Sequence, residues 1–378
     1  MNVLLLSSRF PWPPFTGDRL RAAIWLAALE REGNVALVSP DGVVPAGAPR
    51  VRFHAASRSP ARGAAAALRV VGGAPLQVLL AAPYDWAGAI ARARADVGSF
   101  DAAIVLLSRL DPWVRELLPE GIHVLDAIDS LRRSMAERSR EASPLTRWFW
   151  RAEGRRVARV ESEAAKVYDR VVVVSPDDCA ELGAVAISNG VAIAPLTNAP
   201  RTYDFAFWGR LAYFANADAV TWLLHEIWPM IRAARPDATL LVAGADAPAS
   251  IRAAHGRDGI VVQSPVDDVA ALARQVRVAL LPMRYGTGQS NKVLEAAEAG
   301  CAIVGTQEAL RGFPALERHA VIGSDGGELA RAALTTIADD ERRAAMAASL
   351  RAVVERDFAR QTTLEQLAAL VRPREAAA

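Results

Sequence analysis

Residues 278–306 read VALLPMRYGTGQSNKVLEAAEAGCAIVGT. The first residues of this stretch form a continuous apolar run, which predicts a buried strand. A loop containing Gly286 and Gly288 follows, a helix is predicted to begin near Ser290, and residues 301–306 return to a buried strand. A strand, a loop, a helix and a second strand in this order are typical of a parallel sheet covered by helices.

The same alternation of short apolar runs and amphipathic segments extends along the whole chain of 378 residues. Continuous runs of this length predict strands that are buried on both faces. We therefore predict an α/β protein with doubly wound parallel sheets. The predicted strands are 3–7, 35–39, 102–107, 122–125, 170–175, 204–208, 239–243, 259–262, 278–281 and 302–304.

The chain is longer than one hydrophobic core usually organises. Pro195 and Pro200 interrupt the periodicity and suggest a boundary. We predict an N-terminal Rossmann-like domain, 1–195, a C-terminal Rossmann-like domain, 203–355, and a last helix, 356–378, that is free to return to the first domain. Ligands of such sheets bind outside the carboxyl ends of the strands, so we expect the site in a cleft between two facing domains.

Composition excludes several classes of protein. Hydrophobic residues make up 52% and charged residues 23%, which is typical of a globular protein, and the net charge of +2 gives no general attraction to nucleic acid. The two cysteines, Cys179 and Cys301, match no metal or redox spacing, which suits a reducing compartment. No apolar run approaches the roughly 20 residues of a spanning helix. We expect a cytoplasmic protein.

A cation and a carboxylate lie near the predicted helix start. Lys292 is one of two lysines in the chain, and Glu295 follows three residues later on the same side of the helix. Backbone N–H groups and the dipole at a helix start favour an anion. The pair predicts a nucleoside diphosphate site, in which lysine meets the diphosphate and the carboxylate accepts from two ribose hydroxyls. The alternative is an ordinary loop and an exposed Lys–Glu pair. In either case we expect both side chains on the exposed start of the helix.

Ser290-Asn-Lys-Val-Leu-Glu-Ala-Ala-Glu-Ala-Gly-Cys-Ala-Ile-Val-Gly-Thr306 resembles the donor-binding signature of the retaining "group 1" (family 4-like) glycosyltransferases, which have the GT-B fold. Asp204-Phe-Ala-Phe-Trp-Gly-Arg210 and Asn216-Ala-Asp-Ala219 are similar to the opening strand and loop of that family's second domain. Pro11-Trp-Pro-Pro-Phe-Thr-Gly-Asp-Arg-Leu-Arg21 resembles its N-terminal glycine loop. Within the family, the chain is most similar to transferases associated with exopolysaccharide and exosortase gene clusters.

The resemblance implies a role for each matching residue. Glu295 would hold the donor's ribose hydroxyls, Arg210 and Lys292 would stabilise its diphosphate, Gly17 would pass close to the phosphates and Val266 would lie near the base. The implied donor-binding set is Gly17, Arg210, Val266, Gly288, Gln289, Ser290, Lys292 and Glu295. Thr287 stands eight positions before Glu295, where the family commonly has a second glutamate that contacts the transferred sugar, so the identity of the sugar is left open.

Two acidic residues follow a predicted strand of the first domain. Asp126 and Asp129 could face the cleft, and we take Asp129, with Arg210 and Lys292, as a candidate catalytic residue. The alternative is that Asp129 or Ser130 caps the helix that follows.

The resemblance predicts transfer of a hexosyl group from a nucleotide sugar to a glycan, a lipid-linked or a small-molecule acceptor, with retention. We expect no metal and no cofactor, because no Asp-x-Asp pair occurs in the chain. The alternatives are a non-catalytic nucleotide-sugar-binding protein and a sugar-nucleotide epimerase of the same fold. The loop around Gly286 and Gly288 lacks the third glycine of the dinucleotide fingerprint, and no Walker loop is present.

A basic and aromatic segment lies in the first domain. Residues 131–170 hold eleven basic and six acidic residues, and the part from Leu145 to Arg159 alternates arginine with Trp148, Phe149 and Trp150. Arginine and aromatic side chains favour an anionic bilayer surface. We therefore expect peripheral contact with the inner face of the membrane. The alternative is a long helix whose aromatics pack on the first sheet and whose arginines pair with nearby glutamates.

Overall fold

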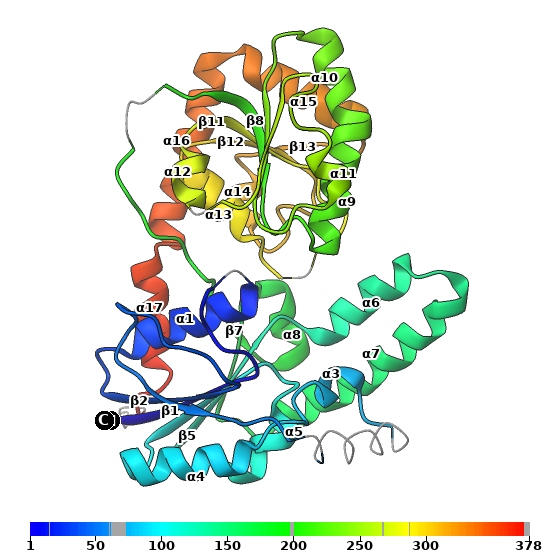
Figure 1. The fold of residues 1–378 in the computed structure, drawn as a ribbon. Coiled ribbons are helices and arrows are strands. Elements are labelled where there is room, and N and C mark those ends of the chain that lie inside the picture. The colour runs from blue at the N-terminus through cyan, green and yellow to red at the C-terminus, as the bar shows by residue number, and fades with distance from the viewer. Residues whose placement is uncertain are drawn as a thin grey trace. The chain divides into compact units, whose positions relative to one another are not determined.

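The computed structural model describes residues 1–14, 16–59, 61, 73–196, 200–266, 268–286 and 288–373. The chain divides into two compact units. The first unit holds Met1–Asn189 together with the segment that begins at Thr363, and the second unit is Gly190–Thr362. Each unit has one parallel sheet with helices against it (Figure 1).

The first sheet has seven strands in the order β3-β2-β1-β4-β5-β6-β7, and every neighbouring pair is parallel. The order reverses at β1, so the strands run outward in two directions from its junction with β4, as in other doubly wound sheets. The strands are β1 (Asn2–Ser7), β2 (Asn34–Ser39), β3 (Arg52–Ala55), β4 (Ala102–Leu106), β5 (Ile122–Ile128), β6 (Arg170–Val173) and β7 (Val185–Ala186).

Side chains of the first sheet alternate between two cores. Leu4 and Leu6 of β1 pack with Trp86 and Ile90 of α4 (Trp86–Val97) on one face. Val3 and Leu5 pack on the opposite face with side chains of α1 (Gly17–Leu29) and α17 (Arg360–Ala369). The period of two along a strand explains this division, and burial of both faces explains why the strand is apolar throughout.

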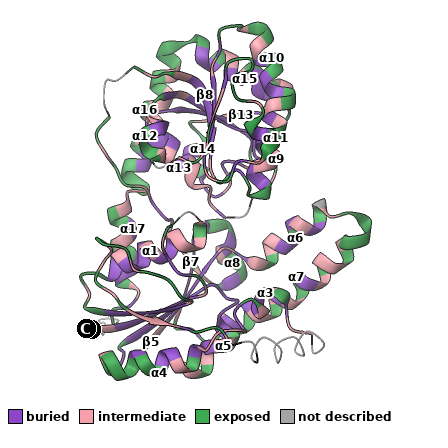
Figure 2. Cartoon of the chain, in the orientation of Figure 1, coloured by how far each residue is buried: buried purple, intermediate pink, exposed green. Residues whose placement is uncertain are grey.

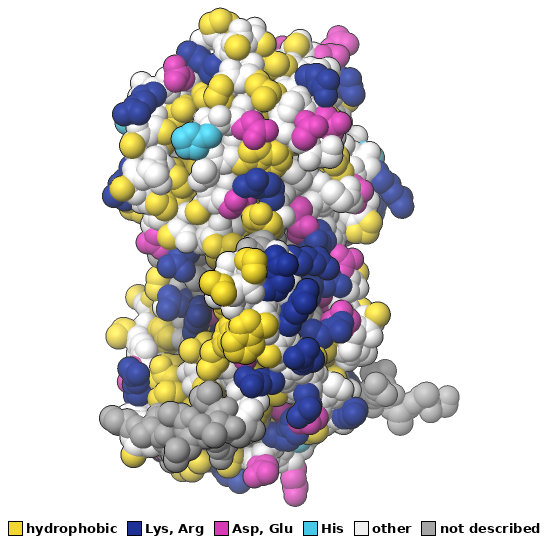
Figure 3. Space-filling view, turned by 90° about the vertical axis from the view of Figure 1, so that its right-hand side faces the viewer, with side chains coloured by type: hydrophobic (Ala, Val, Ile, Leu, Met, Phe, Trp, Pro, Cys, Tyr) yellow, Lys and Arg dark blue, Asp and Glu magenta, His cyan; other side chains and the backbone are white. Residues whose placement is uncertain are grey.

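The helices of the first unit are α1 (Gly17–Leu29), α3 (Leu76–Leu79), α4 (Trp86–Val97), α5 (Asp111–Val114), α6 (Leu131–Glu141), α7 (Pro144–Ala164), α8 (Cys179–Leu182) and α17 (Arg360–Ala369). The helices α6 and α7 lie against each other as a hairpin (Figure 1). Basic side chains gather over this hairpin in Figure 3. In the described ranges, every helix is too short or too polar to span a lipid bilayer.

The second sheet has six strands in the order β10-β9-β8-β11-β12-β13, again all parallel. One apolar core surrounds it, and its central strands are buried on both faces (Figure 2). The strands are β8 (Tyr203–Trp208), β9 (Leu240–Ala243), β10 (Ile260–Gln263), β11 (Val276–Leu281), β12 (Ala302–Gly305) and β13 (Val321–Ile322). The helices are α9 (Phe214–Trp222), α10 (Trp228–Ala234), α11 (Ala249–Arg252), α12 (Val269–Ala273), α13 (Asn291–Glu298), α14 (Pro314–Glu317), α15 (Gly326–Ala338) and α16 (Asp340–Asp357).

The prediction of an α/β protein with doubly wound parallel sheets is confirmed. Each predicted strand has a counterpart in one of the two sheets. Sequence analysis missed β3, β7 and β13, which are edge strands. Two of them have only two residues, and β3 carries an arginine and a histidine, so none forms an apolar run.

Candidate active site

The second sheet has its topological switch point between β8 and β11, which lie side by side at its centre. Ligands of doubly wound sheets bind outside the carboxyl ends of the strands at such a point. The chain leaves β8 through Gly209 and Arg210, and it leaves β11 through the loop that leads to α13. The fold therefore brings the loop of Arg210 next to the helix that carries Lys292 and Glu295.

Lys292 lies in the first turn of α13, after Ser290 at the N-cap position. Its Nζ donates a hydrogen bond to Oδ1 of Asn216 at 2.9 Å and lies 5.1 Å from the ring centroid of Phe207. The side chain is half-buried, so the prediction of an exposed helix start is wrong at this position. Burial lowers the pKa of Lys292 to about 8, although the nearby carboxylate of Glu295 acts in the opposite direction.

Asn216 connects this lysine to the loop after β8. Its Nδ2 donates to the backbone carbonyl of Arg210 at 2.9 Å, while its Oδ1 accepts from Lys292. The amide itself is buried. Sequence analysis quoted Asn216 within a motif and gave it no role, because its partners lie in other segments.

Glu295 lies one turn after Lys292, and its Oε2 accepts a hydrogen bond from Nε1 of Trp208 at 2.7 Å. Burial raises the pKa of Glu295, while the Trp208 hydrogen bond and the Lys292 charge lower it. Glu295 is half-buried, so the predicted exposure is wrong here too. The helix start is covered because Trp208, the last residue of β8, is a core residue that reaches across to α13.

Two glycines let the strand ends approach each other. Gly244 follows β9 with a φ of +145°, and a Cβ there would lie 1.7 Å from the carbonyl oxygen of Gly209. Any larger residue at this position would push the loop of Arg210 away. Gly288, in the loop before α13, is buried and has a φ of 69°, which is a left-handed value that favours glycine.

The other predicted donor-binding residues of the second unit each have their own contacts. Nε of Arg210 lies 2.7 Å from Oδ2 of Asp246, and the arginine side chain is 48% exposed. Gln289 donates from Nε2 to the carbonyl of Gly312 at 2.8 Å, and its buried Oε1 has no partner among the described residues. Val266 is half-buried and packs against the second core. Thr287 lies outside the described residues.

In the first unit, Gly17 begins α1, and a Cβ added there would meet open space. The next residue, Asp18, pairs with Arg9 at 3.3 Å and with Arg109 at 3.4 Å. Arg109 is buried, which lowers its pKa. Sequence analysis missed Arg109; its position shortly after the apolar run 102–107 was the available signal.

Asp126, the first of the two acidic residues that could face the cleft, is buried and has a structural role. Its Oδ2 accepts from Nε of Arg21 at 2.6 Å and from Nε1 of Trp25 at 2.6 Å. Asp126, Arg21 and Trp25 are all fully buried. This carboxylate therefore holds α1 against β5 inside the core.

Asp129 lies just beyond the carboxyl end of β5 and is half-buried. The N-cap of α6 is Ser130, whose Oγ accepts from the backbone N–H of Arg133 at 3.2 Å. The alternative that Asp129 or Ser130 caps this helix is therefore confirmed for Ser130. Burial, followed by the charges of Asp178 and Asp126, raises the pKa of Asp129 to about 7. The preceding Ile128 has a φ of 65°, an uncommon and strained value for a β-branched residue.

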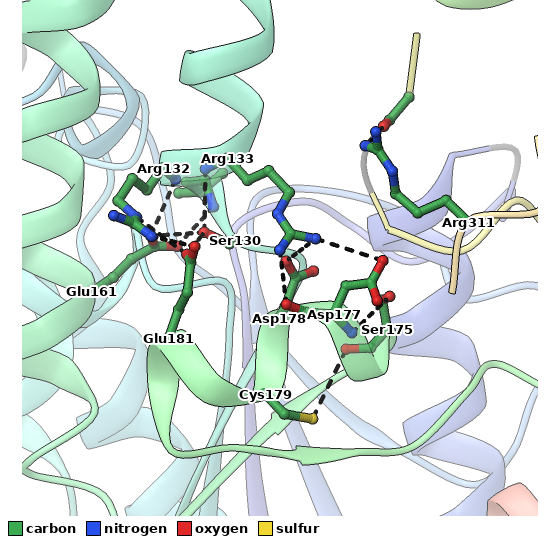
Figure 4. A network of polar contacts seen from close by, with 12 residues as sticks. Ser130, Arg132, Arg133, Glu161, Ser175, Asp177, Asp178, Cys179, Glu181 and Arg311 are labelled. Carbon is green, nitrogen blue, oxygen red and sulfur yellow. Dashed lines mark hydrogen bonds and ion pairs between the residues drawn. The ribbon is translucent and has the colours of Figure 1, made fainter. Parts of the chain in front are cut away.

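A polar network fixes the start of α6 beside Asp129 (Figure 4). Glu161 of α7 accepts from the backbone N–H groups of Leu131 at 2.8 Å and Arg132 at 3.1 Å. Nε of Arg132 donates to Glu181 at 3.1 Å, and Arg133 pairs with Asp178 at 3.2 Å. Within the described residues, no three histidine, cysteine, aspartate or glutamate side chains are grouped so as to hold a metal ion.

Residues 202–340, which lie within the second unit, match the family model described as "Glycosyl transferases group 1". No curated protein matches the chain by sequence.

Solved structures are similar over nearly the whole chain. Sucrose-phosphate synthase from Thermosynechococcus elongatus is 16% identical with a TM-score of 0.74, and the match covers 98% of each chain. HepE of Anabaena, solved with UDP and glucose, is 14% identical with a TM-score of 0.67 over 98% of each chain. The UDP-forming α,α-trehalose-phosphate synthase from Burkholderia xenovorans is 15% identical with a TM-score of 0.67 over 99% of each chain. The prediction of the GT-B fold is confirmed.

Proposed function

We propose that this chain, whose second unit carries a group 1 glycosyltransferase domain, transfers a sugar from a nucleotide sugar to an acceptor. One observation carries the proposal. Lys292 and Glu295 lie within the matched segment, one turn apart on a single helix. At the switch point, Glu295 accepts from the last residue of β8 and Lys292 donates to Asn216 of α9. A cation and a carboxylate in this place suit the diphosphate and the ribose of one ligand.

In this proposal the donor lies along the start of α13. Lys292 and the backbone N–H groups around Ser290 meet the diphosphate, which also suits the dipole at this helix start. Glu295, held by Trp208, accepts from the ribose hydroxyls. Arg210 is half-exposed and paired only with a surface carboxylate among the described residues, so it can turn to the phosphates. HepE, a structure of the same fold, has been solved with UDP-glucose.

The chemical step leaves charge on the departing nucleoside diphosphate. Preorganised positive groups aimed at that charge stabilise the transition state. Lys292 and Arg210 supply fixed charge there, so we infer that transfer needs no metal and no cofactor. We also infer that the transferred group is a hexosyl group and that the configuration at its anomeric carbon is retained. A proton NMR spectrum of the first product would show both the sugar and its anomeric configuration.

The acceptor side belongs to the first unit in this proposal. We keep Gly17, at the start of α1, as a proposed donor-binding residue, because a Cβ added there would meet nothing within 4 Å. Asp129, whose pKa lies at about 7, is suited to take a proton from an acceptor hydroxyl. The acceptor is a glycan, a lipid-linked molecule or a small molecule. We place the transfer reaction in exopolysaccharide synthesis, at the cytoplasmic face of the membrane.

A panel of nucleotide sugars tests the proposal. A donor at 100 times its dissociation constant stabilises the fold by about 2.7 kcal/mol, so a shift in melting temperature identifies it. Lys292→Ala should abolish this shift, while Lys166→Ala, which removes the exposed second lysine, should keep it. Donor binding without transfer or hydrolysis over a wide acceptor panel would contradict the enzymatic assignment.

A further inference from the structure

A basic pocket lies between α6 and α7 of the first unit, apart from the residues assigned to the donor. Its volume is about 640 Å³. Five arginines and one tryptophan line it, namely Arg132, Arg140, Arg147, Arg151, Arg155 and Trp150. Gly154 allows the two helices to come close, because a Cβ at this position would lie 3.3 Å from Cβ of Met135.

Most of this positive charge has no acidic partner among the described residues. Arg132 pairs with Glu181, whereas the other four lining arginines form no ion pair with any described residue. The acidic residues of α7 are engaged elsewhere. Glu153 is buried and accepts from the backbone of Gln77, and Glu161 accepts from the start of α6. The alternative in which nearby glutamates pair with the arginines of α7 holds for Arg156, which lies 4.0 Å from Glu153, but no described glutamate pairs with Arg140, Arg147, Arg151 or Arg155.

Apolar side chains stand beside the pocket on the same helix. Leu145 is 84% exposed and Trp148 is 68% exposed, so these side chains do not pack on the first sheet. Trp150 lines the pocket, and the guanidinium carbon of Arg138 lies 5.3 Å from its ring centroid. Figure 3 shows hydrophobic side chains next to the basic ones on this face.

We propose that the α6–α7 pocket binds the phosphate groups of anionic membrane lipids. Arginine meets phosphate with two parallel hydrogen bonds, and several arginines without an acidic partner among the described residues form a strong site for such groups around one pocket. An anionic bilayer also offers the exposed Trp148 and Leu145 an apolar interface, which a free phosphate does not. This inference goes beyond the transfer reaction and does not depend on it, because the pocket and its charges belong to the first unit alone.

Vesicle binding without any donor tests the pocket. The wild-type protein should co-sediment with vesicles of mixed phosphatidylcholine and phosphatidylglycerol, and not with phosphatidylcholine alone. At about 1 kcal/mol per arginine near the surface, Arg147→Ser with Arg151→Ser should weaken binding on the order of 30-fold. Arg31→Ser with Arg50→Ser removes the same charge from exposed positions outside the pocket and outside α6 and α7, and should keep most of the binding. Trp148→Ser should weaken binding at unchanged net charge.

Three results would overturn the proposal. One is absence of wild-type binding to the mixed vesicles at low salt. Another is an equal loss in the pocket variant and in its control, which would reduce the effect to net charge. The third is calorimetric binding of inorganic pyrophosphate that Arg147→Ser with Arg151→Ser abolishes and Lys292→Ala does not, without vesicle binding, which would assign a soluble phosphate ligand to the pocket. Thermal unfolding checks that each variant is folded, and Arg140→Ser with Arg155→Ser is a second pocket variant.

Discussion

Lys292 donates to Asn216 through a 2.9 Å hydrogen bond that joins the start of α13 to the first turn of α9. The lysine is thereby held in one position before any ligand arrives, which lowers the entropy that donor binding must remove. Burial, however, destabilises the charged form of Lys292, whose Nζ lies against the amide oxygen of Asn216, the ring of Phe207 and the sulfur of Met283.

Replacing Lys292 with methionine should separate stability from activity. The pKa falls from 10.5 to about 8, so the folded protein binds fewer protons than the unfolded chain between these values, and the penalty is largest below pH 8. Removing the charge should therefore stabilise the fold at neutral pH by roughly 1–2 kcal/mol after the lost bond to Asn216 is considered. Transfer should fall about 100-fold or more. Denaturant unfolding and donor kinetics measure the two effects, and near-normal transfer would contradict the role.

Trp208 holds Glu295 by a hydrogen bond, and we predict that this carboxylate recognises the ribose of the donor. Glu295→Gln should weaken donor binding about tenfold or more, because an amide accepts less strongly than a carboxylate from two hydroxyls. The wild type should bind a donor analogue with 2′-deoxyribose more weakly than it binds the ordinary donor. For Glu295→Gln, the affinities for the two donors should differ little. Isothermal titration of both donors with both proteins measures this coupling. Additive losses would show that Glu295 does not contact the ribose.

Transfer should depend on pH with two limbs. Asp129, raised to about 7, must lose its proton to act as a base, so activity should rise through that value. Lys292, lowered to about 8, loses its charge at higher pH, so donor binding by the free enzyme should then fall. Asp129→Asn should remove the rising limb and leave the falling one. A profile of kcat/KM for both proteins gives the answer, and an unchanged rising limb in the variant would exclude Asp129 as the base.

Chelation tests the leaving-group chemistry. We expect transfer to persist in EDTA at close to the untreated rate, because fixed cations are assigned to the diphosphate. The control adds magnesium or manganese after chelation and should give the same rate. Loss of transfer in EDTA that either metal restores would show that Lys292 and Arg210 are insufficient.

The core pair of Arg21 and Asp126 predicts a large effect on stability away from the donor site. Arg21→Met should lower the free energy of unfolding by about 3–5 kcal/mol, because it leaves the buried carboxylate with Trp25 as its remaining side-chain partner. The exposed Arg31→Met provides a matched control and should cost under about 0.5 kcal/mol. Urea unfolding of both variants measures the difference, and equal stability would contradict the assignment.

Sequence reasoning located the central strands because burial on both faces makes them apolar throughout, as in β1 and β11. It also placed Lys292 and Glu295 in the first turns of a helix, since a glycine loop and a periodic segment follow each other there. The burial of these residues depends on Trp208 and Asn216, which are more than 70 positions away in the chain. Such tertiary partners leave no local pattern, and the same holds for Arg21 with Asp126.

The last described helix has a consequence for how the protein is made. Leu367 and Val371 belong to the core that also contains Val3, Leu5 and Trp25, at the opposite end of the sequence. A ribosome therefore releases the entire second unit before it releases the residues that close this face of the first. While residues 190–362 are being synthesised, the first unit has an open apolar surface, so a chaperone that shields such surfaces has its best opportunity during that interval.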